Sequence, residues 1–180
     1  MGRFDGWTMS DTLRNQKKVF IGIDPDVDKS GVCVLFKVNR HITMYSYDFG
    51  QATQFLLSLK DKFSTDDFIV VIESGWMNGS NWHLSKYDTM RSAAKKGEGL
   101  GRNFQVGMCL ESLCKAYDIP YRLQPPLRKC WKGKDGKITH DELVEVTGYE
   151  KKVSNQETRD ATLLAWNEAQ LPIRIKTILC

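Results

Sequence analysis

Residues 18–35 read KVFIGIDPDVDKSGVCVL, and this stretch decides the fold. An apolar run from Val19 to Ile23 ends at Asp24, and Pro25 follows directly. Because a proline favours extended backbone in the residue before it, we expect Asp24 to be the last residue of a strand. A carboxylate buried at a strand end is costly unless a cation meets it. On this stretch alone, an exposed acid that merely opens a turn remains the alternative.

The size and composition of the chain favour one globular domain. Its 180 residues can bury a substantial core, and 41% hydrophobic with 27% charged residues excludes disordered and fibrous classes. The sequence has no apolar run of the roughly 20 residues that cross a bilayer, and its first 18 residues have no signal-peptide core. Its five cysteines show no CxxC spacing, which favours a reduced intracellular protein. We therefore expect a cytoplasmic protein, or one of an organelle or a phage within its host cytoplasm.

Positive charge is concentrated in two parts of the chain, although the net charge is only +4. Residues 122–137 contain six basic residues and one acid, and residues 86–102 contain five basic residues and two acids. Such clusters in loops favour a polyanionic partner, and a solvated surface is the usual alternative.

The first half of the chain predicts four strands and one helix. Short links join three strand-like runs at Val19–Asp24, Val32–Val38 and His41–Phe49, which is typical of an antiparallel meander. Residues 51–63 have apolar side chains at helical spacing, and Asp67–Glu73 is an apolar strand closed by a second acid. A strand reached through a helix should lie parallel to its predecessor.

The second half alternates helices with one more strand. A long loop over 74–101, rich in glycine, serine and asparagine, leads into an amphipathic helix from about Val106 to Tyr117. A short strand over 119–124 ends at two prolines, and the basic loop follows it.

Two capping boxes predict the last two helices. They pair Thr139 with Glu142 and Ser154 with Glu157. The order of elements therefore predicts an α/β fold with a mixed five-stranded sheet, three antiparallel strands followed by parallel strands, flanked by helices. We expect a single domain over 18–180 after a loosely ordered arm at 1–17.

Four acids stand where these elements end or begin: Asp24, Glu73, Glu157 and Asp160. If the first and fourth strands are neighbours, their terminal acids lie about 5 Å apart, and residues three apart share a helix face. Like charges this close raise one another's pKa, and Mg²⁺, which prefers oxygen ligands, would resolve the conflict. Two such ions, for which we expect Mn²⁺ to substitute, can hydrolyse a phosphodiester.

Each acid has an expected role, and Glu157 and Asp160, like Asp24, also have a structural alternative. We expect Asp24 to bridge both ions, Glu73 to bind one, and Asp160, aided by Glu157, to bind the other. Glu157 also fits the N3 position of a capping box with Ser154, and Asp160 fits a first-turn acid favoured by the helix dipole. Glu73 is harder to explain structurally, because it ends a wholly apolar strand.

Three segments, IGIDPDVDKSGVCVL, VVIESGWMN and ETRDATLLAW, resemble in their order the signature segments of RuvC-type Holliday junction resolvases. The resemblance implies a ribonuclease H-like fold and a homodimeric, Mg²⁺-dependent endonuclease that cuts two opposed strands of a four-way DNA junction. It implies that Asp24, Glu73 and Asp160 are metal-binding acids. Glu157 stands where the family usually has Asp or His.

The resemblance also implies DNA contacts. Trp76 stands three residues after the second acid, where the family has an aromatic that wedges against bases near the junction centre. Packing of Trp76 beneath its own loop is the alternative. The family has phosphate-contacting lysines in the loop that here contains Arg128, Lys129, Lys132 and Lys134. Asn103 and Gly107 stand on the helix that borders the family's site.

Other functions fit parts of the pattern. Another ribonuclease H-like metal nuclease, acting on flaps, forks or RNA–DNA hybrids, would use the same acids. An actin-like or sugar-kinase ATPase begins with a similar strand and turn but needs two lobes, for which 180 residues are too few. A non-catalytic junction-binding protein would retain the basic surface, but buried acids without metal would be a liability. The sequence thus predicts a branched-DNA nuclease with no membrane partner and no small-molecule cofactor.

Overall fold

The computed structural model of the chain describes residues 16–78 and 89–173. Within these residues the regular elements follow one another as β1 (Val19–Asp24), β2 (Ser30–Phe36), β3 (His41–Tyr47), α2 (Phe49–Lys62), β4 (Phe68–Glu73), the 3₁₀ turn η1 (Gly75–Met77), α3 (Met90–Ala116), β5 (Tyr121–Gln124), the 3₁₀ turn η2 (Lys134–Gly136), α4 (His140–Thr147) and α5 (Gln156–Glu168).

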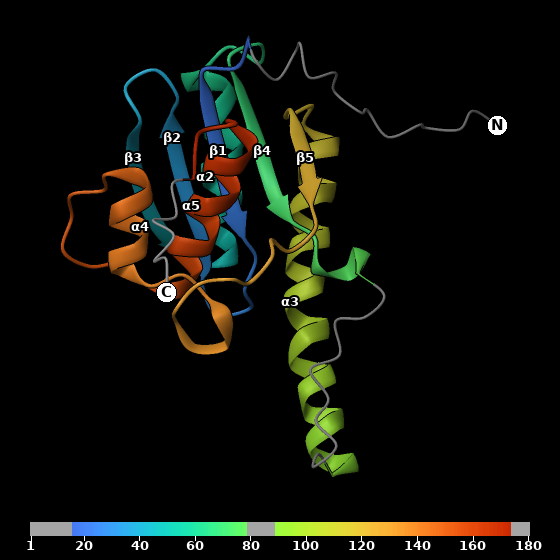
Figure 1. Cartoon of the computed structure of the whole chain (residues 1–180). Coiled ribbons are helices and arrows are strands. Elements are labelled where there is room, and N and C mark those ends of the chain that lie inside the picture. The colour runs from blue at the N-terminus through green and yellow to red at the C-terminus, as the bar shows by residue number, and fades with distance from the viewer. Residues whose placement is uncertain (1–15, 79–88, 174–180) are drawn as a thin grey trace.

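The strands form one mixed sheet in the order β3-β2-β1-β4-β5 (Figure 1). β1 pairs antiparallel with β2, and β2 pairs antiparallel with β3. β4 lies parallel to β1, and β5 lies parallel to β4. Ile23 pairs with Ile72, so that Asp24 and Glu73 end neighbouring parallel strands at the same edge. This arrangement confirms the predicted α/β fold class, with a mixed five-stranded sheet of three antiparallel strands followed by parallel strands, flanked by helices.

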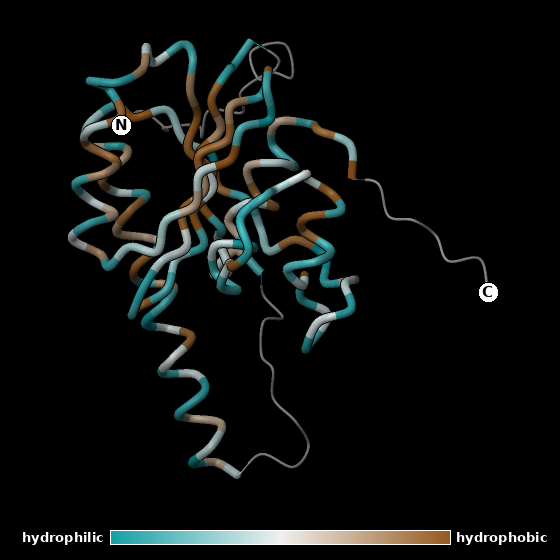
Figure 2. The backbone as a smooth tube through the Cα atoms, turned by 90° about the vertical axis from the view of Figure 1, so that its left-hand side faces the viewer, coloured by the Kyte–Doolittle hydropathy of each residue, from teal (hydrophilic) through white to brown (hydrophobic). Residues whose placement is uncertain are grey.

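Helices cover both faces of the sheet. α2 and α3 pack on one face and α5 lies across the other, over β1 and β2 (Figure 1). Successive side chains of β1 alternate between these two cores, with Phe20 on the α5 side and Ile21 on the α2 side. Because both faces are covered, the central strands are apolar throughout, and Figure 2 shows the most hydrophobic residues gathered in them.

Two glycines allow α5 to lie directly on the sheet. A Cβ at Gly22 of β1 would overlap the carbonyl oxygen of Ala161 and come 3.0 Å from the amide nitrogen of Ala165. A Cβ at Gly31 of β2 would likewise overlap the backbone of Glu157. The absence of side chains at these two positions therefore brings the first turns of α5 to the edge where β1 ends.

The helix α3 begins well before the predicted position. It starts at Met90, where the side chain of Thr89 accepts a hydrogen bond from the backbone N–H of Ser92. The prediction of a loop throughout 74–101 is therefore wrong for residues 90–101, where alanine, lysine and arginine favour helix despite three interspersed glycines. This part of α3 projects away from the body of the domain, on the side of the sheet edge where β4 ends (Figure 1).

Of the two predicted capping boxes in the last two helices, one is present and the other is not. The capping box of Thr139 with Glu142 is present, and Gly148 ends α4 in the left-handed conformation, as predicted. The box of Ser154 with Glu157 is wrong, because the side chain of Asn155 caps α5 by accepting from the backbone N–H of Thr158. Glu157 is thereby released from the capping role.

The predicted N-terminal arm over 1–17 lies, except for its last two residues, outside the described part of the chain. Of the helices that the structure describes, none combines the length and apolar character needed to cross a membrane.

Candidate active site

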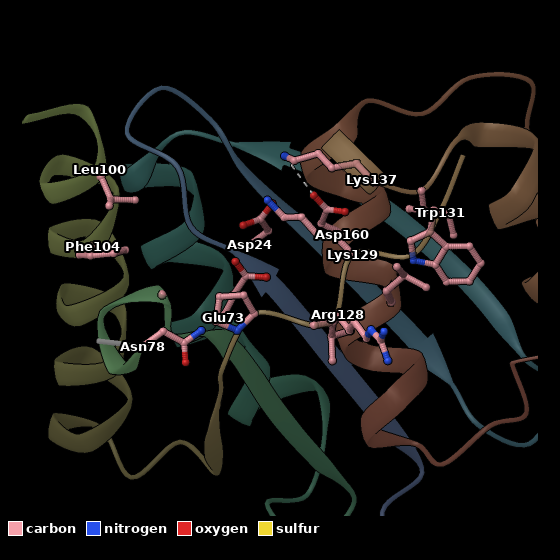
Figure 3. Close-up of a pocket in the computed structure, with 16 residues that line it drawn as sticks. Asp24, Glu73, Asn78, Leu100, Phe104, Arg128, Lys129, Trp131, Lys137 and Asp160 are labelled. Atoms are coloured by element: carbon pink, nitrogen blue, oxygen red, sulfur yellow. Dashed lines mark ion pairs between the residues drawn. The ribbon is translucent and has the colours of Figure 1, made fainter. Parts of the chain in front are cut away.

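Three acids converge where β1, β4 and α5 meet (Figure 3). Asp24 is the last residue of β1, Glu73 is the last residue of β4, and Asp160 lies in the second turn of α5. All three line one pocket of about 380 Å³. The parallel pairing of β1 with β4 places the first two acids, and the close approach of α5 to Gly22 places the third.

The acids oppose one another's ionisation. Burial raises the pKa of Asp24 well above its usual range, and the charges of Glu73 and Asp160 raise it further. Burial, with the charge of Asp160, raises the pKa of Glu73 from its ordinary 4.5 to about 7. Burial also raises the pKa of Asp160, against the opposing charge of Lys137. The protein alone thus leaves this negative charge incompletely compensated.

Glu157 lies apart from the other three acids. It lines a separate hollow formed by the β1–β2 turn and the start of α5, together with Asp26, Asp28 and Lys29. Its charge raises the pKa of Asp24 less than those of Glu73 and Asp160 do. The structure does not bring Glu157 into the pocket of the three acids, and its part in metal binding stays a prediction.

Lys137 joins the acid cluster and was not predicted as a site residue. Its Nζ lies 3.4 Å from Oδ2 of Asp160, and its charge lowers the pKa of all three pocket acids. The sequence feature that could have indicated Lys137 is its position as the last basic residue of the run over 122–137, directly before the buried Ile138. Sequence alone could not show that this segment folds back against α5.

The predicted basic loop divides into two parts. Arg128 and Lys129 line the pocket, and Lys129 extends toward the acids and lowers the pKa of Glu73 (Figure 3). Lys132 and Lys134 do not line it. The backbone N–H of Lys132 instead donates to the carboxylate of Glu142 on α4, at 3.0 Å.

Trp76 packs against α3 at the border of the site. Its ring makes an edge contact with Phe104, with 6.4 Å between ring centroids, and lies over the bare backbone of Gly107. The indole stays partly exposed. Within the part of the chain that the structure describes, the aromatic rings that line the acidic pocket are those of Phe104 and Trp131, neither of which was predicted as a site residue.

Asn103 of α3 fastens the turn that follows Asp24. Its Oδ1 accepts from the backbone N–H of Val27 at 3.0 Å, and its Nδ2 donates to Oδ2 of Asp26 at 2.9 Å. The other oxygen of Asp26 accepts from the backbone N–H of Asp28. Asn103 therefore holds the turn after Asp24 and is not among the residues that line the acidic pocket.

The donor chemistry of the pocket fits a hard divalent cation. Among residues 16–78 and 89–173, no three Asp, Glu, His or Cys side chains are gathered closely enough to hold a metal ion as they stand. Asp24, Glu73 and Asp160 nevertheless offer only carboxylate oxygens, the ligands that Mg²⁺ and Mn²⁺ prefer. Burial raises the pKa of all three carboxyl groups, and neighbouring acids raise those of Asp24 and Glu73 further, so a bound divalent cation would stabilise their charged forms.

Comparisons with known proteins give matches among solved structures only. No protein-family model matches the sequence, and no curated protein matches it. One match is the structure of T. thermophilus RuvC in complex with a Holliday junction substrate, with 15% identity and a TM-score of 0.45 over 82% of this chain and 89% of that chain.

Two further structures are of the same kind. Thermus thermophilus RuvC alone gives 15% identity and a TM-score of 0.45 over 82% of this chain and 90% of that chain. The yeast mitochondrial Holliday junction resolvase Ydc2 gives 10% identity and a TM-score of 0.35, over 92% of this chain and 89% of that chain.

The acid cluster predicts how stability depends on pH without divalent metal. A group whose pKa is raised on folding stabilises the protein below its unfolded pKa, and that contribution is lost as the pH rises through its folded pKa. For Glu73 this window runs from 4.5 to about 7. In EDTA, we expect the melting temperature of wild type relative to Glu73→Gln to fall as the pH rises from about 5 to 7.5. Thermal unfolding followed by circular dichroism measures this difference in melting temperature. A difference that stays constant or rises over this pH window would contradict the assigned burial of Glu73 beside the other acids.

Proposed function

We propose that the protein is a Mg²⁺-dependent, structure-selective DNA endonuclease that resolves four-way junctions. The observation that carries this proposal is the convergence of Asp24, Glu73 and Asp160 beneath a cationic rim at one edge of a ribonuclease H-like sheet. The resemblance of the three sequence segments to RuvC-type resolvases supports the choice of junction DNA. We place its activity in the cytoplasm, or in an organelle, where such DNA is present.

Each part of the pocket has a chemical role in this proposal. Asp24, Glu73 and Asp160 would hold the metal, with Glu157 as a further donor through the adjoining hollow. When bound, Mg²⁺ supplies an activated water and stabilises the charge on the leaving oxygen. Arg128, Lys129 and Lys137 bind the phosphates on either side of the cleaved bond and oppose the negative charge of the acids.

Junction resolution requires two cuts in opposed strands, so we propose that two copies of the chain act together as a homodimer. The exposed part of the Trp76 ring would contact bases near the junction centre. Lys132 and Lys134 extend the basic surface beyond the pocket and would contact more distant phosphates.

A panel of substrates of matched sequence tests this proposal. Four-way junction, flap, fork, RNA–DNA hybrid and linear duplex are each incubated with the full chain and Mg²⁺. We expect the junction to be cleaved fastest, in two opposed strands. Equal cleavage of linear duplex would reject junction selectivity and leave a general nuclease. Tight junction binding without cleavage in either Mg²⁺ or Mn²⁺ would favour the junction-binding alternative.

The rim cations make a separate prediction about the salt dependence of binding. Each phosphate contact contributes about −0.9 to the slope of log K against log salt for duplex DNA. Arg128→Gln and Lys129→Gln should therefore each make the slope for junction binding less steep by about 0.9. Lys151→Gln, on the exposed segment between α4 and α5, serves as the matched control and should leave the slope unchanged. Fluorescence anisotropy at several salt concentrations measures these slopes. Identical slopes for all four proteins would remove Arg128 and Lys129 from the DNA contact.

A further inference from the structure

A closed set of hydrogen bonds connects two residues of α5, neither a predicted ligand, to the acidic pocket. Gln156 Nε2 donates to Oδ1 of Asp160 at 2.8 Å, and Gln156 Oε1 accepts from Nη2 of Arg159 at 2.9 Å. The amide therefore contacts the acid with one end and the guanidinium with the other. Because both its donor and its acceptor are engaged, the rotamer and the amide orientation of Gln156 are defined by its partners.

Arg159 extends this connection to the segment that contains Lys137. Its Nε donates to the carbonyl oxygen of Ile138 at 2.9 Å, and its Nη1 donates to the carbonyl oxygen of Ser154 at 2.6 Å. The Ile138 side chain is buried in a small core with Leu143 and Leu163. The residue after Lys137 is thus held by its side chain from one side and by its carbonyl group from the other.

The two branches meet again at Asp160. Lys137 Nζ lies 3.4 Å from Oδ2, and Gln156 contacts Oδ1. One guanidinium therefore determines both where the Lys137 backbone lies and how the Asp160 carboxylate is turned. Each carboxylate oxygen can accept more than one hydrogen bond, so these contacts leave lone pairs for a metal.

We infer that Gln156 and Arg159 are a positioning pair that orients the Asp160 carboxylate for a divalent cation and holds the Lys137 segment beside it. The inference rests on the proposed function, because it concerns the same pocket. Partners that hydrogen-bond a ligating carboxylate typically change metal affinity or activity by about 10–100-fold when removed. Neither residue needs to touch metal or DNA to have this effect.

Gln156→Met tests the pair, because it keeps the length of the side chain and removes both hydrogen bonds. For the full chain without DNA, calorimetric titration with Mg²⁺ and with Mn²⁺ should show binding weakened by about 10-fold or more. In junction cleavage, the variant should need more Mg²⁺ for half-maximal rate and recover at saturating Mg²⁺, while KM for the junction stays within about 2-fold. Arg159→Lys, which cannot bond Ile138, Ser154 and Gln156 at once as the guanidinium does, should change the metal requirement in the same direction.

A matched control and a second readout separate positioning from a structural role. Gln54→Leu, an exposed position on α2, should leave both metal binding and cleavage unchanged. If Gln156→Met and Arg159→Lys lose activity only in proportion to a lower melting temperature, with wild-type metal affinity, the inference is overturned. It is also overturned if wild type binds neither metal. Weakened metal binding in Gln156→Met together with no cleavage by wild type would uphold the pair and reject the proposed function.

Discussion

Asp24→Asn is expected to lower the rate of four-way-junction cleavage by about 10³-fold or more, which corresponds to about 4 kcal/mol of transition-state stabilisation. The charges of Glu73 and Asp160 both raise the pKa of Asp24, so this acid interacts with each of the other two. Asparagine keeps the shape of the side chain but removes its charge, so the pocket loses a metal ligand without losing its packing. Single-turnover cleavage in saturating Mg²⁺ measures the effect.

The same variant should bind the junction normally and unfold at a higher temperature than wild type in EDTA. Removing one of three mutually repelling buried carboxylates relieves the repulsion that raises their pKa values. Asp61→Asn, at an exposed position on α2, is the matched control and should cleave at the wild-type rate. Cleavage by Asp24→Asn within about 3-fold of wild type would remove Asp24 from the chemistry.

Gly22→Ala is expected to destabilise the protein by about 3 kcal/mol or more, the upper range for overpacking a core. The added methyl group would overlap the carbonyl oxygen of Ala161, and a helix backbone cannot rotate away as a flexible side chain can. To accommodate it, α5 must move off the sheet, which separates Asp160 from Asp24. We therefore expect lost cleavage together with lost stability, measured by urea unfolding and junction assays.

Gly99→Ala is the matched control for this substitution. Gly99 lies in α3, and a Cβ there meets, among the described residues outside its own helix backbone, no atom within 4 Å. In a helix, alanine is more favourable than glycine by about 1 kcal/mol, so this variant should be neutral or slightly stabilised. Equal stability changes in Gly22→Ala and Gly99→Ala would contradict the close contact of α5 with β1.

The sheet and two of its acids could be predicted because the relevant information is local. The runs that end at Asp24 and Glu73 are apolar throughout, since helices cover both faces of β1 and β4. An acid at the end of such a run has no packing role, so its position is itself the signal. For Asp160, the alternative of a first-turn acid could be decided only from the structure, in which α5 lies across the sheet edge.

Other parts of the site depend on contacts between distant segments and could not be predicted. Lys137 reaches Asp160 only because the chain before α4 folds back against α5, through Ile138 and Arg159. Glu157 lies three residues before Asp160, a spacing that predicts a shared helix face. It nevertheless lies in a different hollow, because its backbone rests on Gly31. Helical spacing alone places both acids on nearby faces and does not show which one meets the strands.

The helix α3 illustrates the limit of composition as a guide. Glycines among residues 97–101 indicated a loop, yet the helix continues through them from Met90. Packing requires a glycine at position 107 of the same helix, because the Trp76 ring occupies the space where a side chain of Gly107 would be. Both the start of α3 and the placement of Trp76 therefore required the tertiary structure.

The most direct test of the nuclease centre is strand-by-strand mapping of cleavage in a synthetic four-way junction labelled on each strand. Wild type is compared with Asp24→Asn and Asp61→Asn, in Mg²⁺ and in EDTA. The proposed function predicts nicks in two opposed strands that require Mg²⁺, occur with Asp61→Asn and are absent with Asp24→Asn. The same nicks in EDTA, or with Asp24→Asn, would contradict a metal-dependent centre built on the three acids.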